Sequence, residues 1–562
     1  MISNDKESNY AKFKMNMLVK DNINYILLLV HGMSALPLED EYSKSSFETD
    51  VVIVGAGASG IAAAQVLHQA NINFLLLEAD QKIGGRIQSE KFGDYLVENG
   101  ANWIHGTYCA HNSSIFNPIW ELKHEYDMIG NFTDFEDQNP ITENGKYVDL
   151  KILSDISTEF DNIKSDCLQE GKRLWKMLKE SKEQTSQEDL DISVNECLER
   201  NMMRRRHKND TYARLENDLF RQSISQSVKY LNLDADYAIP SANISLMLWS
   251  KENTADFEYV FENFLVTDQR GYNIFLKEIS APFKEAIKLG HKVYQVNQNS
   301  DGVILKAKAI TYRNPSIKAT TLNLSVKAKL VICTVPLGVL QKDVIQFQPD
   351  LPTAKKASIM AMKMANLAKV FIKFPHNFWG KSDLLLIVRN STNFASISVN
   401  LDHSKYFPGS NMIATFFHGD DAIKVESQDI HETKSELMKI FRRAYSDNIP
   451  DPINIHVTNW THNPLSYGSY SATQLGFTSE MWDLLRENVG RIYFAGEHTS
   501  ENFSGFVHGA YDEGQRIANA VIKRIQTNGS NSATDFSSNS IAYNCIIAVS
   551  LSFLYHIFCA LP

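Results

Sequence analysis

The chain has 562 residues, of which 43% are hydrophobic, so it can bury the cores of two or more domains. Its formal net charge of -10 disfavours general nucleic-acid binding, which normally requires a basic face. An acidic field would instead concentrate cationic ligands. The six cysteines show no CxxC pair or Cys/His cluster with zinc-site spacing, so we expect no metal. The sequence leaves open whether Cys109, Cys167, Cys197 and Cys333 are free thiols or form one or two disulfides.

Residues 1–47 precede the first predicted strand and contain one short apolar run, Asn24–Leu38. Lysines lie before this run, and the acidic stretch 39–41 follows it. This pattern indicates a secretory signal followed by a short linker. The alternative is a disordered leader that carries one apolar patch.

A nucleotide-binding turn follows the first predicted strand. Val51–Val54 is a run of β-branched residues, which is typical of a strand buried on both faces. Gly55, Gly57 and Gly60 then form a G-x-G-x-x-G pattern. In this pattern the first glycine makes a tight turn, and the second lets backbone approach a pyrophosphate. The third allows the following helix to pack closely on the strand.

The segments after the glycines complete the nucleotide-binding pattern. A helix predicted from about Ser59 to Ala70 would offer free N–H groups to phosphate. A second strand, Phe74–Leu77, leads to Glu78, with Ala79 beside it. A carboxylate at this point can accept hydrogen bonds from ribose hydroxyls and disfavours a 2′-phosphate. The order strand, turn, helix, strand and acid therefore predicts a bound dinucleotide.

The next two segments favour FAD over NAD as this dinucleotide. In Gly84-Gly85-Arg86 the arginine can reach the charge of the pyrophosphate, and the two glycines leave room for the pyrophosphate. The segment 98–106 then reads ENGANWIHG. Together these motifs resemble the flavin amine oxidases, and most closely the polyamine oxidases.

The resemblance implies roles for the residues of this second motif. In that family the equivalents of Ala101, Asn102 and Trp103 lie along the flavin, and the following residues stand at the substrate tunnel. His105 occupies a position where some polyamine oxidases carry glutamate and others histidine. A histidine there could attract a distant ammonium group only by accepting a hydrogen bond. We therefore include His105 among the expected catalytic residues.

The middle of the chain is divergent. The region 136–221 is rich in charge and helix formers, and we expect helices of a substrate domain and a surface loop with no chemistry. In 230–237 the resemblance aligns Asp236 best with an acid that lines the tunnel, and Tyr237 with an adjacent aromatic residue. Asp234 and a solvated loop acid are the alternatives.

Three further segments resemble parts of the flavin domain. The turn Asp268–Tyr272 returns to that domain, and Val293 is expected beside the adenine. The segment Thr334–Leu340 follows the predicted strand Leu330–Cys333.

Leu367–Pro375 resembles the family segment in which a lysine bonds through water to the flavin N5 atom. Lys369 is the matching residue, and Lys373 falls on the same side of the strand. The alternative is an ordinary strand-edge lysine. A cation beside N5 could position a water that receives or relays a proton.

Two aromatic residues match the pair that guides the amine at the flavin face in this family. Tyr470 lies after Trp460, a predicted cofactor contact, and Phe506 lies in GFVHG. Aromatic faces attract an amine cation and exclude water. Pro464–Gly476 contains no cysteine, so we expect FAD to be bound noncovalently.

A second flavin motif lies near the C-terminus, in Gly490–Tyr511. Ile492–Ala495 is a predicted strand, followed by a turn at Gly496-Glu497 and by a helix that continues through Ala520. The resemblance implies that Glu497 holds the ribityl or phosphate region of FAD. The helix, with Val507 in its first turn, would point at the flavin.

The last residues predict a membrane attachment. Residues 541–562 contain no Asp, Glu, Lys or Arg and are long enough to span a bilayer. With the polar spacer before them, they match a GPI-attachment signal, with the attachment site within 528–533; a retained tail anchor is the alternative. We therefore expect an extracellular or cell-surface protein of the secretory pathway. Several Asn-x-Ser/Thr sites permit glycosylation, namely Asn112, Asn131, Asn209, Asn243, Asn323 and Asn390.

The expected fold is a two-domain FAD-dependent amine oxidase fold, α/β plus α+β. A Rossmann-like FAD domain would be interleaved with a mixed-sheet substrate domain. We assign 48–130, 271–350 and 456–525 to the FAD domain, 131–270 and 351–455 to the substrate domain, 526–540 to the spacer and 541–562 to the tail.

The expected activity is oxidation of spermine or spermidine at a carbon beside a secondary amine, with O2 reoxidising FAD to give H2O2. A related flavin monoamine or L-amino-acid oxidase and a non-catalytic surface flavoprotein are the alternatives. A histone-lysine demethylase is disfavoured because the chain has no long coiled-coil insertion. We expect no nucleic-acid partner and a monomer or weak dimer.

Overall fold

The computed structural model describes residues 46–109, 117–181, 185–206, 219–253, 259–260, 262–311, 320–389 and 394–532. The apolar run of the predicted signal and the uncharged C-terminal tail both lie outside these ranges. Within them, no helix combines the length and the apolar character that a bilayer span requires.

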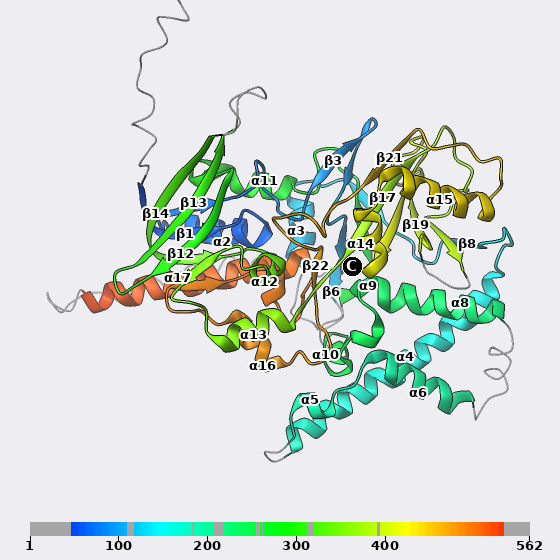
Figure 1. The fold of residues 1–562 in the computed structure, drawn as a ribbon, viewed down its shortest axis with the longest axis horizontal. Coiled ribbons are helices and arrows are strands. Elements are labelled where there is room, and N and C mark those ends of the chain that lie inside the picture. The colour runs from blue at the N-terminus through cyan, green and yellow to red at the C-terminus, as the bar shows by residue number, and fades with distance from the viewer. Residues whose placement is uncertain are drawn as a thin grey trace, which may run out of the picture.

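An eight-stranded sheet forms one half of the molecule (Figure 1). Its order is β11-β2-β1-β14-β13-β12-β15, and β23 pairs with β14. β1 runs parallel to both β2 and β14, and β23 runs parallel to β14, as in a Rossmann-like core. The strands are β1 (Ser46–Val54), β2 (Phe74–Leu77), β11 (Ile287–Lys288), β12 (His291–Gln298), β13 (Val303–Thr311), β14 (Thr320–Cys333), β15 (Gln346–Gln348) and β23 (Ile492–Phe494).

The first strand is buried on both faces, as its sequence predicts. Val51 and Ile53 belong to one hydrophobic cluster, and Val52 and Val54 belong to the cluster on the opposite face. The first cluster includes residues of α2 (Ala58–Gln69), α11 (Ile274–Ser280) and α17 (Val507–Ser532). The second includes residues of α12 (Leu337–Gln341), α13 (Thr353–Ala361) and α16 (Ser479–Arg486).

The helix α17 is longer than the sequence predicts. It continues beyond Ala520 to Ser532, because Val521, Ile522 and Ile525 still pack against the core. Helix packing is close here: a Cβ added to Gly514 would lie 2.1 Å from the carbonyl oxygen of Ser59 in α2.

A six-stranded sheet forms the other half, in the order β21-β17-β20-β19-β18-β8 (Figure 1). One face packs on α14 (Gly419–Ser427) and α15 (Ile430–Ala444). The opposite face packs on residues of β3, β4, β5 and β10, which connect it to the nucleotide-binding half. The strands are β8 (Gln138–Thr142), β17 (Leu367–Lys373), β18 (Leu384–Val388), β19 (Ile397–Asn400), β20 (Met412–His418) and β21 (Asn454–Val457).

The second sheet extends past one of the boundaries that we placed on the sequence. Because β21 pairs with β17, the segment around residue 456 still belongs to the second sheet, and the chain returns to the first half after it.

Small sheets join the two halves. Their strands are β3 (Ser89–Phe92) with β4 (Tyr95–Glu98), β5 (Trp103–His105) with β10 (Asn263–Val266) and β7 (Gly130–Phe132), β6 (Tyr108–Cys109) with β9 (Tyr259–Val260), and β16 (Lys363–Ala365) with β22 (Tyr470–Ala472).

A layer of helices lies against the second half (Figure 1). A disulfide between Cys167 and Cys197 joins α4 to α6, and Cys333 in β14 is a buried free thiol. The helices are α3 (Pro118–Glu125), α4 (Leu150–Glu180), α5 (Gln187–Leu190), α6 (Val194–Arg206), α8 (Leu219–Lys229), α9 (Ala235–Tyr237) and α10 (Leu246–Glu252), of which α3 lies apart from this layer.

Candidate active site

The glycine turn after β1 has the geometry of a phosphate-binding turn. A Cβ on Gly60 would lie 1.9 Å from the carbonyl oxygen of Gly55, so only glycine allows α2 to begin this close to the strand. A Cβ on Gly57, by contrast, would meet no atom within 4 Å. Gly84 pairs with Gly57, and Gly85 lies against it. The second glycine motif therefore borders the open space beside Gly57.

The start of α2 offers unsatisfied donors to an anion. Its N-cap, Gly57, makes no capping bond through a side chain, and the first turn contains no acidic residue. The hydroxyl of Ser59 is buried and has no hydrogen-bond partner among the described residues. Free N–H groups, a positive helix end and an unpaired hydroxyl fit a pyrophosphate.

Glu78 lies directly after β2, next to the glycine turn. Its carboxylate accepts hydrogen bonds from the backbone N–H groups of Ala56, at 2.6 Å, and Asp80, at 2.7 Å. Burial raises the pKa of Glu78, and these backbone bonds oppose the rise. The two N–H groups fix the carboxylate at the strand end, where a ribose can bind.

Arg86, which is half-buried, and Glu497, which is buried, form an ion pair with an N–O distance of 2.7 Å. Glu497 also accepts a hydrogen bond from the hydroxyl of Ser471 and one of 2.8 Å from the backbone N–H of Gly505. Burial alone would raise the pKa of Glu497, but the Arg86 charge and the hydrogen bonds outweigh it and lower the pKa. The pair thus brings together both flavin motifs and the segment that carries Tyr470.

Lys369 is buried in β17, with 2% of its surface exposed. Its Nζ donates to the Glu98 carbonyl oxygen at 2.9 Å, to Asn102 Oδ1 at 2.7 Å and to the Gly100 carbonyl oxygen. Burial lowers the pKa of Lys369 to about 7, against the opposing charge of Glu98. A cavity of about 20 Å³ beside it could hold one water molecule. Lys369 thus anchors the segment that the resemblance places along the flavin.

His105 and Phe506 lie together. Their ring centroids are 5.2 Å apart in an edge-to-face arrangement, and Nδ1 of His105 is 2.8 Å from Oδ1 of Asn263. Because an amide oxygen can only accept, Nδ1 carries the proton and Nε2 is left as an acceptor. Burial lowers the pKa of His105 to about 4, so its imidazole is neutral.

Tyr470 connects this aromatic pair to the predicted substrate acid. Its ring contacts Gly505, next to Phe506, and its hydroxyl donates to the backbone carbonyl of Asp236 at 3.0 Å. Asp236 is exposed. Desolvation of its carboxylate raises its pKa to about 6, and the charge of Lys164 opposes the rise. Asp234 instead accepts the backbone N–H of Ser241 at 2.6 Å and holds a turn.

The remaining predicted residues surround these groups. The indole N–H of Trp103 donates to the hydroxyl of Thr133, and its ring stacks on Phe416. The backbone N–H of Ala101 donates to the backbone carbonyl oxygen of Arg86. The indole of Trp460 donates to the carbonyl of Asn99, and Val293 lies in the apolar cluster with Leu77. Gly496 lies at the turn before Glu497, Val507 begins α17, and Ala79 follows Glu78.

Two acids that border this region were not predicted from the sequence. Glu426 accepts the backbone N–H groups of Trp460 and Thr461, both at 2.8 Å, and so fixes the loop before Tyr470. Glu252, at the end of α10, bonds to Tyr237 and Thr473. The sequence feature that could have indicated Glu252 is its position as an acid at the end of the apolar helix α10.

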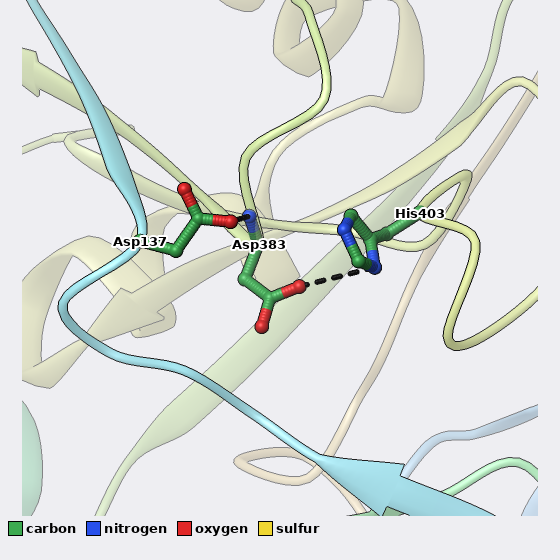
Figure 2. A group of neighbouring side chains, drawn as sticks. All are labelled: Asp137, Asp383 and His403. Atoms are coloured by element: carbon green, nitrogen blue, oxygen red, sulfur yellow. Dashed lines mark hydrogen bonds and ion pairs between the residues drawn. The ribbon is translucent and has the colours of Figure 1, made fainter.

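A separate cluster of Asp137, Asp383 and His403 lies at the edge of the second sheet (Figure 2). His403 Nδ1 is 3.2 Å from one carboxylate oxygen of Asp383, and Lys405 Nζ is 2.7 Å from the other. Because Lys405 already supplies a cation to the buried carboxylate, we assign no metal to this cluster.

Comparison with known proteins gives the class to which this arrangement belongs. A family model described as flavin containing amine oxidoreductase matches residues 58–522. The chain belongs to this family and is an FAD-dependent amine oxidase with the corresponding two-part fold.

Relatives and solved structures agree with this assignment. The chain is 32% identical to polyamine oxidase 7 of Oryza sativa subsp. japonica over 481 residues, which cover 82% of this chain and 92% of the relative. It is 30% identical to polyamine oxidase 1 of Zea mays over 488 residues, or 85% and 91% of the two chains. A putrescine oxidase structure with putrescine bound has the same fold, with a TM-score of 0.62 at 18% identity, covering 85% of this chain and all of the other.

The open position of Gly57 allows FAD binding to be tested apart from folding. We expect Gly57→Ala to lower the FAD bound per protein, because its methyl group projects into the space beside the α2 N-terminus. The unfolding temperature of the apoprotein should not change, since the φ of -75° suits alanine. Flavin absorbance and circular dichroism measure the two properties.

Gly60→Ala is the matched control, because its methyl group would overlap the Gly55 carbonyl oxygen and should destabilise the apoprotein itself. Full FAD content in Gly57→Ala would exclude a close approach of the cofactor at this glycine.

Proposed function

We propose that this enzyme oxidises polyamines such as spermine and spermidine at a carbon beside a secondary amine. One observation carries the proposal: Asp236, whose backbone carbonyl accepts the hydroxyl of Tyr470, has a carboxylate with no ion-pair partner among the described residues. A cationic substrate would supply the missing charge, and the aromatic rings suit an amine. The similarity to plant polyamine oxidases supports the same substrate class.

The proposed reaction balances with O2 and water as co-substrates. The amine loses a hydride and a proton to become an imine, and water cleaves the imine to an aldehyde and a shorter amine. O2 takes up the two electrons and two protons and leaves as H2O2. When bound, FAD supplies the hydride acceptor.

The residues of this chain would position the amine and move its proton. Tyr470 and Phe506 would confine the reacting carbon and exclude water. The neutral His105 would accept a hydrogen bond from a substrate ammonium through Nε2. Lys369, with a pKa near 7, would hold or relay a proton beside the segment 98–102.

An amino-acid oxidase is the second candidate, but it needs a cation for the substrate carboxylate. Arg86 does not supply one, because it is paired with Glu497. Tyr470 instead bonds to the backbone of the acid Asp236, and the neighbouring Tyr237 bonds to a second acid, Glu252.

Product analysis tests the proposed function. Incubation with spermine, spermidine and N-acetylspermine should yield an aldehyde, a shorter amine and one H2O2 per amine cleaved, as measured by mass spectrometry and a peroxide assay. The masses also identify which side of the secondary nitrogen is oxidised. If amino acids or simple monoamines are oxidised and polyamines are not, the alternative oxidases gain support. If FAD is bound but no amine is consumed, the protein is a non-catalytic flavoprotein.

Substitution of Lys369 tests its chemical role. We expect Lys369→Met to lower kcat by about 10²-fold or more, the usual contribution of a proton-transfer group, while FAD stays bound. Lys373→Met is the matched control, since Lys373 lies on the same strand face and pairs with Asp94 instead. Equal turnover in the two variants would exclude a proton-transfer role for Lys369.

We also propose that the enzyme enters the secretory pathway and is displayed on a membrane surface, with residues 541–562 serving as a GPI-attachment signal or, alternatively, as a retained tail anchor. The uncharged tail and its polar spacer support this placement. The disulfide between α4 and α6 is typical of an oxidising compartment. Of the possible glycosylation sites, Asn131, Asn243 and Asn323 lie among the described residues, and their side chains are exposed.

Enzymatic release from cells tests this placement. A phosphatidylinositol-specific phospholipase C should release the activity if a GPI anchor is present, and a peptide N-glycosidase should lower its apparent mass. Activity that stays with the membrane after the phospholipase indicates a retained tail anchor. Activity found only in the cytosol contradicts the proposal.

A further inference from the structure

Glu252 is a second carboxylate in the region of Asp236 and Tyr470. It is the last residue of α10, and its side chain is half-buried. One carboxylate oxygen accepts the hydroxyl of Tyr237 at 3.0 Å, and the other accepts the hydroxyl of Thr473 at 3.1 Å. Tyr237 directly follows Asp236, and Thr473 ends the segment that begins with Tyr470. The segments that carry the proposed amine site therefore also hold Glu252.

No cation neutralises this carboxylate in the described part of the chain. The adjacent Lys251 forms its ion pair with Glu501 and lies over the ring of Trp175, 5.6 Å from its centroid. The groups that contact Glu252 are neutral hydroxyls. Burial raises the pKa of Glu252 to about 7, and the hydroxyl bonds and the Lys251 charge oppose the rise only in part. A half-buried acid that contacts hydroxyls and forms no ion pair among the described residues is a candidate for binding a cationic ligand.

The hydrogen bonds leave this carboxylate able to bind a further donor. A carboxylate has about four lone-pair positions, of which Tyr237 and Thr473 use two. An ammonium group has three donors and no acceptor, so it complements the remaining positions. The two hydroxyls would fix the orientation of the carboxylate before a ligand arrives, which lowers the entropy cost of binding.

We propose that Glu252 is a specificity-determining residue that binds one ammonium group of a polyamine while Asp236 binds another. This inference rests on the proposed polyamine oxidation and adds a second anionic position to it. A substrate with two or more cationic groups would contact both acids, whereas a monoamine would contact only one. Glu252 would thus favour polyamines over monoamines in binding, without taking part in the bond-breaking step.

A pair of ligands of equal length separates charge recognition from general binding. 1,10-Diaminodecane carries two ammonium groups, and decylamine carries one. Calorimetric titration of oxygen-free holoenzyme should show tighter binding of the diamine. We expect Glu252→Gln to weaken diamine binding about tenfold, as for loss of one hydrogen-bonded charge, and to leave decylamine binding unchanged. In turnover, KM for spermidine should rise by a similar factor while kcat is retained.

Three further variants control for shape, folding and net charge. Glu252→Asp keeps the charge and should retain part of the diamine preference. Thr473→Ala removes one donor and should weaken diamine binding less than Glu252→Gln; it also provides a test if Glu252→Gln does not fold. Glu432→Gln changes the same net charge on the exposed surface of α15 and should alter neither ligand.

The outcomes distinguish this inference from the proposed function. Equal weakening of both ligands by Glu252→Gln, or no weakening of either, would make Glu252 a structural residue and overturn the inference. If the unmodified enzyme oxidises no polyamine, the proposed function fails instead, whatever the binding data show.

Discussion

The ion pair between Arg86 and Glu497 is the interaction on which the site depends. The two residues lie 411 positions apart in the sequence, and their side chains meet at 2.7 Å. Glu497 also binds the segment of Tyr470 and the loop before α17. Three stretches of chain, around residues 86, 471 and 497–505, therefore converge on one buried carboxylate. Removing Arg86 would leave the buried carboxylate of Glu497 unpaired, which typically costs about 3–5 kcal/mol.

Three acids of the site region differ in whether a cation compensates them. Glu497 has an arginine partner, and its pKa is lowered despite burial. Asp236 and Glu252 have no such partner among the described residues, and burial raises their pKa values to about 6 and about 7. Glu497 is buried and compensated, whereas Asp236 is exposed and Glu252 is half-buried, and under the proposed function these two acids would bind a cationic ligand.

Local motifs with strict backbone requirements could be predicted from the sequence. Val51–Val54, Phe74–Leu77 and the glycine turn all take the expected form, because burial on both faces and the close approach at Gly60 leave few alternatives. Resemblance to a family, rather than periodicity, indicated Lys369, Tyr470 and Phe506. Glu252 was not predicted because its hydrogen-bond partner Thr473 is distant in the sequence. The domain boundary near residue 456 was misplaced by a few residues, since strand pairing with β17 is not visible in one segment alone.

The disulfide of the helical layer and the ion pair of the site make different parts of the molecule sensitive to different agents. The bond between Cys167 and Cys197 closes a loop within α4 to α6 and crosses into neither sheet. The two flavin motifs are instead held by charge. Because the pKa of Glu497 is depressed in the folded protein, its contribution to stability is present above its usual pKa of 4.5 and is lost as the pH falls through the folded value. A reductant would therefore act first on the link between α4 and α6, and acid on the link between the two flavin motifs.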